Sequence, residues 1–173
     1  MPTIFDSHLH IIDPKFPLVS NQSYTPPPFT VNDYFKSTET LDVIGGAVVS
    51  GSFQAYDQTY LLAALKQLGS PFVGVTQLSD STSDEEIIRY DQSRIRAIRF
   101  NFKRMELFDL KALEKFAKRV YELVGWHVEL YVDSKDLKDL SPFLLKLPKF
   151  SIDHLGLSQE GFSDLLKLVE KGG

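Results

Sequence analysis

Short apolar segments alternate with segments of helical spacing along this chain. Strands are predicted to begin near residues 3, 43, 72, 95, 126 and 150, because each segment there is apolar and too short for a helix. Between them, apolar side chains recur at helical spacing, as in residues 56–68, which end at Gly69. Further helices are expected at about 30–38, 84–92, 107–124, 134–147 with a break at Pro142, and 160–171. Thr30 and either Thr82 or Ser83 have the side chains of helix N-caps.

This alternation predicts parallel strands joined by right-handed crossovers. A doubly wound open sheet and a (β/α)₈ barrel both fit the pattern. No glycine-rich phosphate motif follows the first strand, and polar residues lie at the ends of several strands, which favours the barrel. The prediction is therefore an α/β, TIM-barrel-like fold with about six of the eight β/α units. Residues 1–173 would form a single incomplete barrel domain.

The first predicted strand ends in the sequence Asp6-Ser7-His8-Leu9-His10. Alternate side chains of a strand share a face, so Asp6, His8 and His10 point one way, with the two imidazoles about 6 to 7 Å apart. Two neutral imidazoles at this spacing can bind one metal ion or one polarised substrate atom. The alternative is a chance pair on an exposed strand.

Two later strands each combine an apolar face with a polar face. Arg99 and Asn101 share one face of residues 95–102, while His127, Glu129 and Tyr131 share one face of residues 126–132. Burying an unpaired charge is costly, so these side chains are expected to contact one another, a ligand or water. The alternative is a polar network that only stabilises the fold.

The strand at residues 150–154 ends in His154, with Asp153 expected to face away or to lie at the junction of strand and loop. The segment before the first helix, residues 11–29, contains Pro26-Pro27-Pro28 and is longer than most connections. It is read either as a loop over the mouth of a site or as a surface excursion.

Composition narrows the classes of function. The chain has 173 residues, 43% of them hydrophobic, a net charge of −4 and no cysteine. Nucleic-acid affinity is therefore not implied, and thiolate metal sites are excluded. No secretory signal or apolar run of about 20 residues is present, so the sequence predicts a cytoplasmic protein with no membrane contact.

Four segments together resemble successive motifs of the amidohydrolase-2 family and, within it, the group of 2-pyrone-4,6-dicarboxylate hydrolases. They are residues 6–10, 98–102, 125–128 and 152–156. The resemblance implies a TIM-barrel hydrolase of small organic acids in which His8, His10 and His154 are catalytic and together bind a divalent metal, zinc, or act without one. Arg99 would bind a substrate carboxylate, and Asn101, His127 and Tyr131 would be further substrate contacts.

The sequence departs from the family pattern in two places. The family's catalytic aspartate follows an eighth strand, which this sequence does not supply, and Leu157 and Ser158 stand where an arginine is usual. The resemblance implies hydrolysis of a small anionic lactone, ester or amide. The alternatives are a truncated, inactive chain, an anion-binding module, or a decarboxylase. The open strand edges of an unclosed barrel would favour a homodimer.

Overall fold

The computed structural model describes residues 2–20, 25–103 and 109–171. The chain forms two compact units, the first made of residues 1–77 and 89–96 and the second of residues 78–88 and 97–173. Helix α3 (Asp84–Gln92) and strand β4 (Ile95–Asn101) contribute residues to both units. The two units are described in turn.

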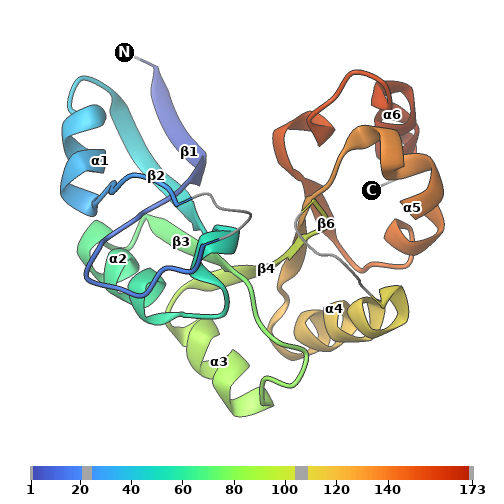
Figure 1. Cartoon of the computed structure of the whole chain (residues 1–173), viewed down its shortest axis with the longest axis horizontal. Helices are drawn as coiled ribbons and strands as arrows, with labels where there is room; N and C mark the ends of the chain where they lie inside the picture. Colours follow the sequence, from blue (N-terminus) through green and yellow to red (C-terminus); the bar gives the residue numbers. More distant parts are fainter. Residues whose placement is uncertain (1, 21–24, 104–108, 172–173) are drawn as a thin grey trace. The chain divides into compact units, whose positions relative to one another are not determined.

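Three parallel strands, in sequence order, form the sheet of the first unit: β1 (Thr3–Leu9), β2 (Asp42–Val49) and β3 (Phe72–Thr76). Helices α1 (Val31–Ser37) and α2 (Thr59–Leu68) and the 3-10 helix η1 (Ser52–Gln54) connect them (Figure 1). Thr30 caps α1 in a reciprocal capping box with Asp33, as its residue type predicts. Gly69 follows α2 with a φ of 89°, in the left-handed region that glycine favours.

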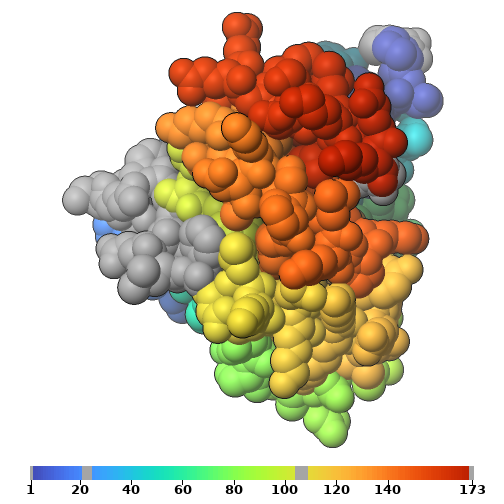
Figure 2. Space-filling view, turned by 90° about the vertical axis from the view of Figure 1, so that its right-hand side faces the viewer, coloured from blue at the N-terminus to red at the C-terminus, as the bar shows by residue number. Residues whose placement is uncertain are grey.

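The second unit contains most of β4, then β5 (His127–Tyr131) and β6 (Phe150–Ile152), again parallel and in sequence order. Its helices are α4 (Leu110–Val124), α5 (Leu137–Leu144) and α6 (Phe162–Glu170), with the 3-10 helices η2 (Ser134–Asp136) and η3 (Asp153–Gly156). The orange and red surface in Figure 2 includes residues of α5 and α6. The alternation of strand and helix and the parallel direction of the strands are therefore confirmed within both units.

Three predicted boundaries change. Helix α5 continues through Pro142 instead of breaking there and ends at Leu144. Strand β6 ends at Ile152, so Asp153 and His154 belong to η3. Helix α4 begins at Leu110 behind the N-cap Asp109, and residues 107–108 of the predicted helix lie outside the described residues.

The predicted loop after β1 is closed at its base. Ile12 and Phe29 form an antiparallel bridge, with backbone N–H···O distances of 2.7 and 2.9 Å. The backbone N–H of Val19 also donates to the carbonyl of Phe53, at 2.8 Å. Residues 21–24 of this loop lie outside the described residues. Among the described helices, none has the length and apolar character needed to cross a bilayer.

Candidate active site

The first unit presents a pair of histidines at the end of β1. The ring centroids of His8 and His10 are 5.0 Å apart, and the rings are nearly perpendicular. Nδ1 of His10 lies 2.7 Å from the carbonyl oxygen of Val49. Because a carbonyl can only accept, Nδ1 carries the proton, so in the neutral ring Nε2 has the lone pair. The rings of Phe53 and His10 pack in a T-shaped arrangement, with centroids 6.0 Å apart.

Asp6 anchors the strand that carries these histidines. Its Oδ1 accepts from the backbone N–H of His8 at 3.4 Å, and its Oδ2 accepts from the Tyr34 hydroxyl at 3.2 Å. Tyr34 is buried, and burial together with the neighbouring Asp6 raises its pKa to about 12. The phenol therefore stays protonated and donates to Asp6 throughout the neutral range, so Asp6 orients the end of β1.

The histidine pair fits a divalent cation. Imidazole nitrogens are common zinc ligands, and a ligand histidine usually donates its other N–H to a carbonyl or carboxylate. His10 already makes this second bond to Val49. The donor chemistry of His8 and His10 is therefore that of two metal ligands on one strand end.

A buried cluster of three charged side chains lies in the second unit. Arg99 donates to Asp153 Oδ2 through Nη2 at 2.6 Å and through Nε at 3.2 Å. The same Nε lies 3.2 Å from Oε1 of Glu129. All three residues are 6% exposed. The prediction that Arg99 and Glu129 lie on one face is confirmed, because the two residues are also direct partners in the register of β4 and β5.

One guanidinium therefore faces two carboxyl groups. The pKa of Glu129 is raised to about 8, first by burial and then by the negative charge of Asp153, whose effect exceeds the lowering by Arg99. We conclude that Glu129 holds a proton near neutral pH, which leaves one ionised carboxylate for one guanidinium.

Tyr131 connects this cluster with His154. The Arg99 guanidinium lies 5.1 Å from the centroid of the Tyr131 ring. The rings of Tyr131 and His154 form a T-shaped pair with centroids 6.1 Å apart. Asn101 is the register partner of Tyr131 at the ends of β4 and β5. Its Oδ1 is buried and has no hydrogen-bond partner among the described residues. Four of the predicted site residues thus lie at the carboxyl ends of neighbouring strands.

His127 lies at the other end of β5. It pairs with Ala97 in the register, four residues before Tyr131. Burial, and to a smaller degree Lys149, lowers its pKa. The structure therefore does not bring His127 to the strand ends where Asn101 and Tyr131 lie.

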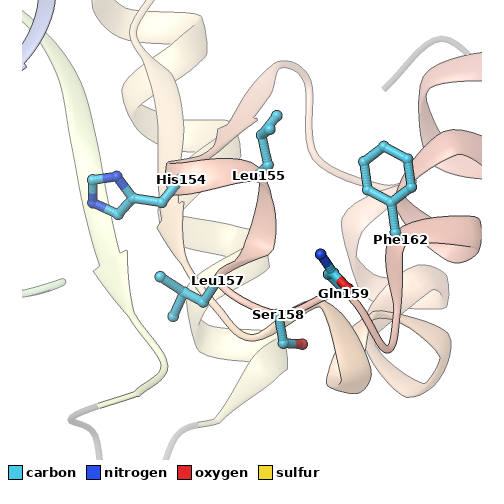
Figure 3. Close-up of a pocket in the computed structure, with 6 residues that line it drawn as sticks. All are labelled: His154, Leu155, Leu157, Ser158, Gln159 and Phe162. Atoms are coloured by element: carbon cyan, nitrogen blue, oxygen red, sulfur yellow. The ribbon is translucent and has the colours of Figure 1, made fainter.

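A hollow of about 490 Å³ adjoins His154 within the second unit. Figure 3 shows its lining: His154, Leu155, Leu157, Ser158, Gln159 and Phe162. The hollow has the volume of small-molecule sites, and apolar side chains form much of its wall.

Of the two predicted alternatives for Asp153, the position at the junction of strand and loop is confirmed. The side chain does not face away, because it pairs with Arg99. Strand periodicity alone could not show this pairing, because it also depends on the register between β5 and β6. Ser151 is the register partner of Glu129, so two residues further on Asp153 shares that polar face.

Comparison with known proteins identifies the family of this chain. Residues 5–173 match the family model described as Amidohydrolase. A 2-pyrone-4,6-dicarboxylate hydrolase from Comamonas testosteroni is 31% identical over 178 residues, which cover 96% of this chain. A 4-sulfomuconolactone hydrolase from Rhizobium radiobacter is 25% identical over 100 residues, which cover 57% of this chain and 33% of the length of that hydrolase.

A solved structure has the same fold. It is a probable 2-pyrone-4,6-dicarboxylic acid hydrolase from Acinetobacter baumannii with citric acid bound. The TM-score is 0.83 at 23% identity, covering 95% of this chain and 65% of that one. The likeness confirms the predicted α/β fold, part of a TIM barrel. The chain spans 58% of the length of the Comamonas relative.

Proposed function

The chain belongs to the amidohydrolase family, and on that premise we propose that it hydrolyses the ester bond of a small anionic lactone. The observation that carries the proposal is the row of Arg99, Tyr131 and His154 at the carboxyl ends of the strands, beside a hollow of ligand size. In β/α barrels this end of the strands is where active sites lie. The two named relatives are hydrolases of a pyrone dicarboxylate and of a sulfonated lactone, both anionic cyclic esters.

The histidines are proposed to act on the carbonyl that is attacked. His8, His10 and His154 would polarise this carbonyl and stabilise the oxyanion that develops in the transition state. We propose that the same three residues hold a divalent cation, zinc. When bound, such an ion lowers the pKa of a coordinated water to about 7 and acts as a Lewis acid.

Arg99 is proposed to orient the substrate through a carboxylate. A planar guanidinium suits this task, and burial strengthens the interaction. Nε and Nη2 donate to Asp153, and this pairing fixes the orientation in which the guanidinium would meet the substrate carboxylate. Asn101 and Tyr131 flank this arginine and would contact the substrate, with Asn101 Oδ1 available to accept from a donor on it.

The chain is further proposed to reside in the cytoplasm and to associate as a homodimer. Among the described strands, β1 pairs with β2 and β6 pairs with β5, each along one side. An open parallel edge favours pairing with another chain. Sedimentation equilibrium would give twice the mass of 19.6 kDa for a dimer.

The test of function measures turnover of 2-pyrone-4,6-dicarboxylate and of simpler lactones, by the loss of the ring's absorbance. The double variant His8→Ala/His10→Ala and the single variant His154→Ala should each lose at least a hundredfold in kcat/KM. Glu122→Gln, a change on the exposed side of α4, is the matched control and should be neutral.

Zinc content per chain, measured on protein purified without chelator, should fall in the double variant. Equal turnover by wild type and the histidine variants would refute the catalytic roles. Binding of the dicarboxylate with no product would show an anion-binding module, and release of CO2 would show a decarboxylase.

A further inference from the structure

The turn that follows β6 has an unusual backbone. His154, Leu155 and Leu157 have φ angles of 51°, 51° and 65°, and Gly156 between them has a φ of 75°. For residues with a Cβ the left-handed region is strained, and for leucine it is rare. Three such residues within four positions persist only where the surrounding structure holds them.

Hydrogen bonds from the segment after β5 hold this turn. The Ser158 hydroxyl donates to Asp133 Oδ1 at 2.6 Å, and the Ser134 hydroxyl donates to the carbonyl of Ser158 at 2.6 Å. The Gly161 backbone N–H in turn donates to the Ser134 hydroxyl at 3.2 Å. Asp133 is 8% exposed and also accepts from Lys103 Nζ at 3.1 Å, which ties the end of β4 to the same carboxylate.

The backbones also approach closely at this point. A Cβ on Gly156 would lie 2.7 Å from the Cβ of Ser134, and a Cβ on Gly161 would overlap the Ser134 carbonyl. Both glycines therefore allow a contact that a larger residue would block. The start of η2 is thus packed directly against the turn, and the turn has little room to relax while this contact is made.

We propose that Asp133, Ser134 and Ser158 form a clamp that holds His154 in its strained conformation, and that they are positioning residues for its imidazole. The proposal rests on the proposed function in giving His154 a catalytic role. In Figure 3 the His154 ring points away from Phe162, and Ser158 lies on the same turn as His154. The clamp also fixes the wall of the hollow, because four of the six lining residues belong to residues 154–158.

The first experiment asks whether the turn is strained. Leu155 is 71% exposed, so Leu155→Gly loses little burial and should relieve the left-handed backbone. The equilibrium constant for unfolding in urea should fall about fivefold to tenfold. Leu145 is 45% exposed at the end of α5 with a φ of −66°, and Leu145→Gly should raise that constant. If both glycine variants are destabilised alike, the strain, and with it the proposal, is refuted.

The second experiment asks whether the clamp positions His154. Ser158→Ala removes the hydroxyl that binds Asp133, and Ser158→Thr keeps a hydroxyl. Ser163→Ala is the matched serine change, at an exposed position of α6. The readouts are the ¹H–¹³C resonances of the His154 ring in histidine-labelled protein and the amide exchange rates of residues 154–158.

Ser158→Ala should shift the His154 ring resonances and speed amide exchange about tenfold, the size expected for one lost hydrogen bond. Ser158→Thr should restore both readouts, and Ser163→Ala should match wild type. In chains that turn over a lactone, kcat should fall about tenfold in Ser158→Ala with KM within twofold of wild type.

The outcomes separate the two proposals. Unchanged His154 resonances and exchange rates in Ser158→Ala would overturn the positioning role, whether or not the chain has activity. Shifted resonances together with a fully active His154→Ala variant would support the clamp and refute the catalytic role of His154.

Discussion

Replacing Glu129 by glutamine should make the protein's stability less dependent on pH. Glu129 is 6% exposed, and its carboxyl group lies, with that of Asp153, against the single guanidinium of Arg99. Its pKa is raised from 4.5 to about 8, first by burial and then by Asp153. Glutamine has nearly the same volume and cannot ionise, so the variant removes the titration and keeps the packing.

The direction in which stability changes with pH follows from the raised pKa of Glu129. Below pH 4.5 both folded and unfolded chains carry the proton, whereas between about 4.5 and 8 only the folded chain does. The contribution of Glu129 to stability is therefore complete at low pH and is lost as the pH rises through this window. One such proton changes the free energy of unfolding by about 1.4 kcal/mol per pH unit, or about 2 to 3 kcal/mol between pH 5.5 and 7.5.

Urea denaturation of wild type and Glu129→Gln at pH 5.5, 6.5 and 7.5 measures this difference. Comparing the two proteins cancels the contributions of other titrating groups to the free energy of unfolding. One of these groups is His127, whose lowered pKa makes stability fall as the pH decreases through 6.5. Relative to wild type, Glu129→Gln should gain stability at each step upward in pH, and Glu122→Gln should not. Parallel pH profiles for wild type and Glu129→Gln would refute the shared-proton description of the cluster.

Two further predictions concern the first unit. Arg94→Lys should destabilise the chain by about 1 to 3 kcal/mol, measured by urea denaturation. The Arg94 guanidinium donates to the carbonyls of Leu65, Gly69 and Phe72, and a lysine cannot reach all three. An unchanged urea midpoint would contradict this prediction. Tyr34→Phe should cost about 1 kcal/mol, because it removes the donor to Asp6, and should also remove the phenolate absorbance step near pH 12. Retention of that step would assign it to another tyrosine.

Most of the fold could be predicted from periodicity and turn chemistry. Apolar runs bounded by polar segments placed the strands, and residues such as Thr30, Gly69 and Gly125 marked helix ends correctly. Pro142 misled because a proline is expected to break a helix, whereas here the tertiary packing of Leu140, Phe143 and Leu144 keeps α5 intact. Local propensity could not anticipate that packing.

The candidate site was less predictable. Strand parity placed Arg99 and Glu129 on one face, since parity depends only on the two-residue repeat of a strand. The pairing of Arg99 with Asp153 depends on the register between β5 and β6, which the sequence does not show. The left-handed backbone at His154 and Leu155 could not be predicted either, because leucine disfavours it and neither position carries glycine or asparagine.

The charge on the Arg99 cluster should also control the binding of anions. With Glu129 protonated, the charges of Arg99 and Asp153 sum to zero, and an anionic ligand meets no net repulsion. With Glu129 ionised, the cluster carries one net negative charge, which is weakly screened because the cluster is buried. Affinity for a dicarboxylate should therefore fall as the pH rises through about 8, the pKa of Glu129. Glu129→Gln should bind with an affinity that is nearly constant from pH 6.5 to 9, measured by calorimetry. The same loss of affinity at high pH in Glu129→Gln would show that another group repels the ligand.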